Sequence, residues 1–300
     1  MPSLMVEMRE ALDLHDGHRV LEIGTGTGYN AALLSHRLGA ERVVSIDIDP
    51  DLVDAARQRL EVLGHAPTLV AGDGLGGVPD HGPYDRIIAT CAVPQVSHEW
   101  IKQLAPGGAM FINLRGDIAG VLCLLSKHGE DDEVIGSVIR SDGNFMWLRR
   151  DLDSPFRDEE PSTVIGAKKV ARRLTTLSPG NILEDKDFLW SLQLELPGLR
   201  MICSTEVFDP MDKVSRPGTL MYAEDGSHAQ VIIEPEADGR HRVIQGGCRR
   251  LWDTVEMAHE WWVRLRNPDP CRFSIVANST IQFVSLDGDT NWLRWPLPLA

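Results

Sequence analysis

The sequence has no disulfide framework, no long apolar run and no surplus of basic charge. Its five cysteines are odd in number, widely spaced and free of any C-x-x-C pair, so we expect reduced, mostly buried thiols. No apolar run approaches the roughly eighteen residues of a membrane span, and the first residues do not pair a basic segment with an apolar one. We therefore predict a cytoplasmic protein with no membrane partner.

Charge and composition narrow the possible partners further. The formal net charge is -14, whereas a surface that neutralises nucleic-acid phosphates needs clustered Lys and Arg, so we expect no nucleic-acid partner.

His259 and Glu260 begin a pattern typical of zinc proteases, but Val263 stands where the second histidine is needed, so we predict no metal site. With 300 residues, 43% of them hydrophobic and 25% charged, the chain is long enough for two globular domains.

Three alternating glycines, Gly24, Gly26 and Gly28, follow an apolar run at 20–23 and precede an apolar stretch at 29–38. This order predicts a strand, a tight turn and a helix, because glycine accepts positive φ and lets a ligand approach the backbone. Structural turns and dinucleotide sites also use such glycines, but the dinucleotide fingerprint is G-x-G-x-x-G. Here the order is G-x-G-x-G, with Glu22 two residues ahead.

Acidic residues end the next two predicted strands. Asp47 closes the second strand, where a carboxylate can accept both ribose hydroxyls of a nucleoside. Asp49 precedes a proline and is assigned instead to the cap of the following helix. Asp73 and Gly74 close the third strand, where the acid can meet the exocyclic amine of adenine and the glycine leaves room for the ring. A simple turn aspartate is the alternative for Asp73.

Strands alternate with helices as far as a strand at 109–114. This predicts an α/β fold with a doubly wound, mostly parallel sheet covered on both faces. Apolar runs at 121–125 and 134–139 predict an antiparallel hairpin added to the sheet edge. Ligands of such sheets lie over the carboxyl ends of the strands. The residues expected there are Gly24, Asp47, Asp73 and Thr90.

These motifs together resemble class I S-adenosylmethionine (AdoMet) dependent methyltransferases, and residues 1–125 resemble protein-L-isoaspartate O-methyltransferases more closely. The resemblance is carried by the run Val-Leu-Glu-Ile-Gly-Thr-Gly-Thr-Gly-Tyr-Asn-Ala-Ala-Leu-Leu at 20–34, by Pro-Ser-Leu-Met at 2–5 and by Leu-x-Pro-Gly-Gly at 104–108. It implies a Rossmann-like fold with AdoMet as the cofactor. The cofactor-binding residues that it implies are Glu22, Gly24, Thr25, Gly26, Gly28, Asp47, Ile48, Asp73, Gly74 and Thr90.

The resemblance also implies the acceptor, an isoaspartyl or aspartyl carboxylate of a protein or peptide. A carboxylate is already ionised at neutral pH, so methyl transfer to it depends on positioning, and we assign no catalytic residue. The role would be protein repair or the maturation of a ribosomally made peptide, as in actinobacterial members with a long C-terminal extension. Members carry a Ser or Thr two residues before the proline that matches Pro2. Met1 directly precedes that proline, so we expect an N-terminal, acceptor-side segment to be missing.

Changes in composition predict how the chain is divided. The expected segments are an AdoMet-binding domain at 1–150, a linker at 151–178 and a smaller α+β domain at 179–300. The linker is charged and punctuated by prolines. The last segment adds strands and tryptophans but no glycine–acid motif, so we expect it to recognise the acceptor.

Two other functions fit parts of the sequence. An NAD-dependent dehydrogenase would share the strand, turn and helix together with Asp47, but it needs G-x-G-x-x-G and a proton-transfer residue. A module that binds AdoMet without turnover would keep the cofactor motifs and lack the acceptor site. Only a measurement of activity separates such a module from an enzyme.

Overall fold

The computed structural model describes residues 2–129, 131–140, 143–151, 170–209, 212–286 and 293–297. The chain divides into two compact units. The first unit takes in Met1–Arg115, Gly120–Glu159 and Cys271–Ala300, and the second takes in Gly116–Ala119 and Glu160–Pro270.

A ten-stranded mixed sheet forms the first unit, in the order β15-β14-β13-β7-β6-β5-β4-β1-β2-β3. The parallel strands are β1 (Val20–Ile23), β2 (Val43–Asp47), β3 (Thr68–Ala71), β4 (Tyr84–Val93) and β5 (Leu104–Arg115). The strands added in antiparallel pairing are β6 (Gly120–Lys127), β7 (Glu133–Arg140), β13 (Phe273–Asn278), β14 (Gln282–Leu286) and β15 (Arg294–Pro296). The predicted α/β sheet and its β6–β7 hairpin are confirmed, and the antiparallel half is larger than the sequence indicates.

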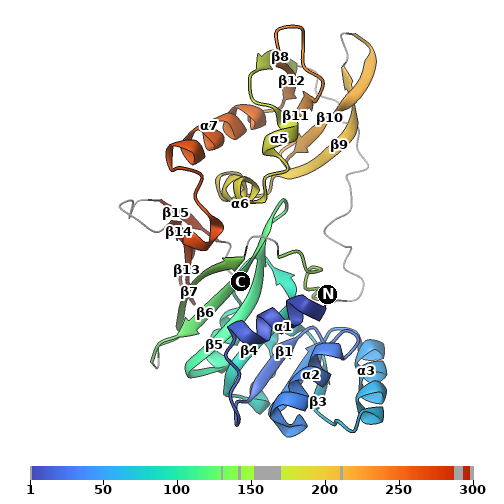
Figure 1. The fold of residues 1–300 in the computed structure, drawn as a ribbon, viewed down its shortest axis with the longest axis vertical. Coiled ribbons are helices and arrows are strands. Elements are labelled where there is room, and N and C mark those ends of the chain that lie inside the picture. Colours follow the sequence, from blue (N-terminus) through green and yellow to red (C-terminus); the bar gives the residue numbers. More distant parts are fainter. Residues whose placement is uncertain are drawn as a thin grey trace. The chain divides into compact units, whose positions relative to one another are not determined.

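Helices flank the strands of this sheet, and α1, α2 and α3 are drawn in blue in Figure 1. Their bounds are Pro2–Ala11 for α1, Tyr29–Leu38 for α2, Pro50–Val62 for α3 and His98–Gln103 for α4. Met8 of α1 and Leu34 of α2 are fully buried in one cluster with Phe111 of β5. As predicted, Asp49 caps α3, because its Oδ1 accepts two backbone N–H groups of the first turn at 3.0 and 3.3 Å.

The strands β13, β14 and β15 correct the predicted domain boundary. We expected 179–300 to form one domain, but β13 pairs with β7 of the first sheet, with Ser274 opposite Ser137. Gln282 anchors this hairpin, because its Oε1 accepts the Val96 N–H at 2.9 Å and its Nε2 donates to the Val96 carbonyl at 2.8 Å. The local sequence predicts the hairpin itself. It does not predict which sheet the hairpin joins, because a local apolar pattern does not specify the partner strand.

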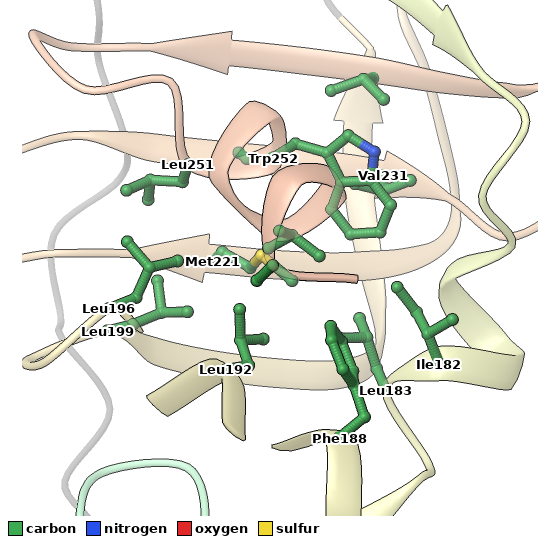
Figure 2. Close-up of a cluster of buried hydrophobic side chains, with 14 of the residues drawn as sticks. Ile182, Leu183, Phe188, Leu192, Leu196, Leu199, Met221, Val231, Leu251 and Trp252 are labelled. Carbon is green, nitrogen blue, oxygen red and sulfur yellow. The ribbon is translucent and has the colours of Figure 1, made fainter. Parts of the chain in front are cut away.

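The second unit is an antiparallel five-stranded sheet, β8-β12-β11-β10-β9, with three α-helices among its described residues. Its elements are β8 (Val170–Thr175), α5 (Pro179–Ile182), α6 (Lys186–Glu195), β9 (Arg200–Asp209), β10 (Val214–Tyr222), β11 (His228–Ile232), β12 (His241–Gly246) and α7 (Leu251–Arg264). Figure 2 shows its core, in which Leu192 of α6 and Trp252 of α7 lie with Met221 and Val231 of the sheet. This is the smaller α+β unit that the sequence predicts.

The predicted linker at 151–178 is wrong at its end, because β8 lies there and pairs with β12. This strand contains polar residues, so no apolar pattern predicts it from the sequence. In the fold these polar residues have polar partners. Arg173 contacts Asp253 and Glu256 of α7, with its Nη2 2.6 Å from the Glu256 carboxylate. Residues 152–169 of the predicted linker lie outside the described residues.

Two thiols differ from the expectation that most are buried. Cys123 is buried and Cys91 is half-buried, whereas Cys248 and Cys271 are exposed. The side chain of Cys203 lies outside the described residues.

Within the described ranges, no helix is long and apolar enough to cross a membrane. These described residues also contain no group of three or more His, Cys, Asp or Glu side chains that could hold a metal ion.

Candidate functional site

The loop between β1 and α2 takes the backbone conformation that its glycines permit. Gly24, Gly26 and Gly28 have φ values of 97°, 51° and 81°. A Cβ on Gly24 would lie 2.9 Å from the Thr90 Oγ1, so only glycine fits this close approach of the loop to β4. A Cβ on Gly26 would meet no atom within 4 Å. The loop therefore turns sharply at Gly24 and leaves open space beside Gly26.

Asp47 at the end of β2 holds this loop in place. Its Oδ2 accepts the Gly26 N–H at 2.8 Å, and its Oδ1 accepts the Asp49 N–H at 3.2 Å. Thr90 supports the other side of the loop, because its hydroxyl donates to the Gly24 carbonyl at 2.8 Å. The carboxyl ends of β1, β2 and β4 thus meet around the glycines, as the sequence predicts.

Glu22 of β1 lies fully buried beneath the loop. Its Oε2 accepts the Ser45 hydroxyl at 2.6 Å, and its Oε1 accepts the Asn30 Nδ2 at 2.9 Å. Ser45 is hydrogen-bonded in turn to the Thr25 hydroxyl at 2.6 Å. Burial raises the pKa of Glu22 to about 7, against the lowering effect of the Ser45 and Asn30 hydrogen bonds. Glu22 therefore connects β1, β2, the loop and α2.

A cavity of about 450 Å³ opens at this edge of the sheet. The predicted site residues that line it are Glu22, Gly24, Thr25, Gly26, Asp47, Ile48, Gly74 and Thr90. Gly28 and Asp73 are not among its lining residues. The Oδ1 of Asp73 accepts the Leu75 N–H at 2.9 Å, which is the turn role weighed as its alternative. Contact of Asp73 with a ligand stays a prediction.

The sequence analysis missed one wall of this cavity, which residues 145–149 form. The segment runs along the end of β4, because the Ala92 N–H donates to the Met146 carbonyl and the Leu148 N–H donates to the Ala92 carbonyl, at 2.8 and 2.9 Å. The available signal was a run of four apolar side chains within a polar stretch, Phe145, Met146, Trp147 and Leu148. No motif marks them as part of a site.

Two residues of β5 hold this wall. The buried Asn113 accepts the Phe145 N–H through its Oδ1 at 3.0 Å. Arg115 donates to the Phe145 carbonyl at 3.1 Å, and its guanidinium carbon lies 5.0 Å from the centre of the Trp147 ring. The wall is thereby fixed to the sheet rather than left as a free loop.

Cys91 also lines the cavity. Burial raises the pKa of its thiol to about 12. The thiol is therefore protonated at neutral pH.

Part of the chain matches the model of a known protein family. Residues 1–141 match the family model for Protein-L-isoaspartate(D-aspartate) O-methyltransferase. The protein-L-isoaspartate O-methyltransferase of Fervidobacterium nodosum is 39% identical over 131 residues, which cover 43% of this chain and 66% of that protein. The corresponding protein of Xanthobacter autotrophicus is 47% identical over 114 residues, which cover 38% and 51%. The chain spans from about half to about two thirds of the length of these relatives.

The fold has a solved counterpart. A protein-L-isoaspartate O-methyltransferase structure has a TM-score of 0.52 to this chain at 21% sequence identity, over 96% of this chain and 81% of that one. At this identity the likeness concerns the fold alone.

Proposed function

Because residues 1–141 belong to the protein-L-isoaspartate O-methyltransferase family, we propose that this chain transfers a methyl group from AdoMet to a carboxylate. The acceptor is an isoaspartyl or aspartyl residue of a protein or peptide. Residues 1–141, which match the family model, include the glycine loop and the strands β1 to β7 of the first sheet.

One observation carries this proposal. The cavity over the carboxyl ends of the parallel strands joins a loop of positive-φ glycines to the acid that ends β2. Open space beside Gly26 admits a ligand against the backbone, and Asp47 presents a carboxylate at the position where such folds receive ribose hydroxyls. A nucleoside-containing cofactor fits this arrangement of space and acceptors.

The chemistry requires little of the chain's acids and bases. AdoMet supplies a methyl group on a sulfonium: a carboxylate oxygen forms the new O–CH3 bond, the S–CH3 bond breaks with its electrons returning to sulfur, and no proton moves. The chain's residues therefore bind and orient the two reactants. The wall at 145–149, which Arg115 holds through its hydrogen bond to the Phe145 carbonyl, lines the cavity beside the cofactor loop, so we assign the acceptor to that side.

The second unit is assigned to acceptor recognition. Among its described residues no glycine–acid motif recurs, and the cavity is lined by residues of the first unit only. The methyl ester formed closes to a succinimide when the neighbouring amide nitrogen attacks it and methanol leaves. Either repair of isoaspartyl sites or ring formation in a maturing peptide uses that step. We place the reaction in the cytoplasm.

The test combines binding with turnover in the full chain. Titration calorimetry with S-adenosylhomocysteine (SAH) measures cofactor binding, and radiolabelled AdoMet measures methyl transfer to an isoaspartyl peptide. The matched control peptide carries asparagine at the same position and offers no carboxylate there. We expect SAH binding and label on the isoaspartyl peptide alone.

Each alternative predicts a different result. Binding of SAH without transfer to isoaspartyl or aspartyl peptides would identify a binding module without turnover. Binding of NAD with no binding of SAH would favour a dehydrogenase and overturn the proposal.

A further inference from the structure

Two side chains of β5 bind both backbone groups of one wall residue, Phe145. The Asn113 Oδ1 accepts the Phe145 N–H at 3.0 Å, and the Arg115 Nη1 donates to the Phe145 carbonyl at 3.1 Å. Asn113 and Arg115 are two residues apart on a strand, so their side chains leave β5 on the same face. They therefore hold Phe145 as a paired strand would hold it, through its N–H and its carbonyl together.

The amide of Asn113 is a rigid support. It is completely buried, and its Nδ2 donates to the Val121 carbonyl at 3.0 Å and to the Gly143 carbonyl at 3.1 Å. A Cβ on Gly143 would clash with this Nδ2, so the close approach requires a glycine. Turning the amide over would point its oxygen at two carbonyls, so only one orientation satisfies all three partners.

The wall leaves apolar side chains exposed while polar side chains hold its backbone. Met146 is 75% exposed, and Phe145, Trp147 and Leu148 are half-buried. The hydrophobic effect stabilises a segment in proportion to the apolar area removed from water, so it contributes little at Met146. Hydrogen bonds to β4 and β5 fix the segment instead. A fixed segment with open apolar side chains at a cavity is typical of a surface that binds a ligand.

Arg115 also orients the largest side chain of the wall. Its guanidinium carbon lies 5.0 Å from the centre of the Trp147 ring, within the range of a cation–π interaction. Phe145 and Trp147 both line the cavity. Arg115 therefore fixes the backbone of one lining residue and the ring of another.

The role of this support rests on the proposed function, which assigns the acceptor to the wall side of the cavity. Transfer to a carboxylate that is already ionised depends on orientation, and a displacement of about 1 Å can lower a rate by about a hundredfold. We propose that Asn113 and Arg115 are positioning residues for the acceptor, because they fix the wall against which the acceptor binds. Neither is among the cavity-lining residues, so both act through Phe145 and Trp147.

The experiment measures two KM values in the full chain, one for an isoaspartyl peptide and one for radiolabelled AdoMet, together with SAH affinity. Arg115→Met keeps the length of the side chain without its guanidinium group, and Arg115→Lys keeps a positive donor. Arg86→Met is the matched control. Arg86 is a half-buried arginine of β4 that donates to the Leu12 carbonyl at 2.6 Å and does not line the cavity.

A second pair of variants tests the amide. Asn113→Leu removes its three hydrogen bonds at similar side-chain size. Gln282→Leu is the control, because the buried Gln282 binds both backbone groups of Val96 in the same way and does not line the cavity. If Asn113→Leu does not fold, the Arg115 variants decide the question.

In Arg115→Met we expect the KM of the peptide to rise at least about tenfold, the effect of one hydrogen bond from a charged group. The KM of AdoMet and the affinity for SAH should stay within about twofold. Arg115→Lys should return the peptide KM to within about threefold of wild type. Asn113→Leu should resemble Arg115→Met. Both controls should leave both KM values within about twofold, even where urea unfolding shows a loss of stability.

Three results would overturn the inference and leave the proposed function standing. One is a peptide KM in Arg115→Met within about twofold of wild type, and another is an equal rise of both KM values in that variant. The third is an equal rise of the peptide KM in Arg86→Met. Absence of methyl transfer to the peptide by the wild type would instead remove the proposed function and the inference with it.

Discussion

The backbone N–H of Gly26 donates to the Oδ2 of Asp47 at 2.8 Å, so the glycine loop is joined to the end of β2 by one acid. The same carboxylate faces the cavity where we expect the ribose. Asp47 thus has two tasks, and its replacement should affect ligand binding more than the removal of any nearby acid.

Asp47→Ala should weaken SAH binding by at least about tenfold, because hydrogen bonds to a charged group contribute about 1.5–3 kcal/mol each. Asp49→Ala is the control two residues away. It removes the cap of α3 and should lower the free energy of unfolding by about 1 kcal/mol while SAH affinity stays within about twofold. Calorimetry and urea unfolding measure the two effects. Equal SAH affinity in Asp47→Ala and wild type would contradict the ribose assignment.

Gly26→Ala should separate backbone strain from lost ligand space. Gly26 and Gly17 both have positive φ, 51° and 90°, and a Cβ on either meets no atom within 4 Å. Each alanine variant should lose about 1–2 kcal/mol of unfolding free energy, the cost of a left-handed residue with a Cβ. Only Gly26 lines the cavity, so Gly26→Ala alone should bind SAH at least about tenfold more weakly. Similar SAH affinity in both variants would refute ligand contact at Gly26.

Glu22 should make the stability of the first unit depend on pH. Burial raises its pKa from 4.5 to about 7 in the folded chain. Between these values the folded state holds a proton that the unfolded chain has lost, so the free energy of unfolding should fall as pH rises from about 4.5 to 7. The total loss should be on the order of 3 kcal/mol, from about 1.4 kcal/mol per pH unit.

Glu22→Gln provides the comparison, because the amide cannot ionise and still offers an oxygen to Asn30 and a donor toward Ser45. Relative to the variant, the wild type should lose stability steadily across that pH window in urea unfolding. A constant difference between the two proteins from pH 5 to 8 would show that Glu22 ionises at an ordinary pKa.

Gln282→Leu should destabilise the first unit even though Gln282 lies far along the chain from the glycine loop. Both hydrogen bonds to Val96 would be lost, and each buried backbone group left unpaired costs about 1–3 kcal/mol, so we expect a loss of about 2–6 kcal/mol. Ser285→Ala on the same strand is the control and should change stability by less than about 0.5 kcal/mol. Equal unfolding free energies in the two variants would show that the β14 anchor adds nothing.

A deletion at the boundary that the sequence predicts cannot test the role of the second unit. Removing everything from residue 179 onward would also take β13, β14 and β15 out of the first sheet. The recognition role is better tested by exchanging the described surface residues of that unit, with SAH affinity as the measure that the first unit stays folded.

Local sequence determined the elements that carry the cofactor motifs. The positive φ values at the three glycines, the Asp49 cap and the short apolar strands depend on neighbours a few residues away, and each is confirmed. The order of strand and helix was sufficient to place Gly24, Asp47 and Thr90 at one edge, because parallel strands with short crossovers align their carboxyl ends.

Tertiary structure alone decided which distant segments complete the unit. Hydrogen bonds to Ala92, Asn113 and Val96 position the wall at 145–149 and the strands β13 to β15. The sequence of these segments does not predict which residues they bond to. The pKa of Glu22 also depends on the tertiary structure, because it is raised by burial beneath the loop rather than by neighbours in the chain. Strand pairing and desolvation arise from residues far apart in sequence, so only the assembled fold fixes them.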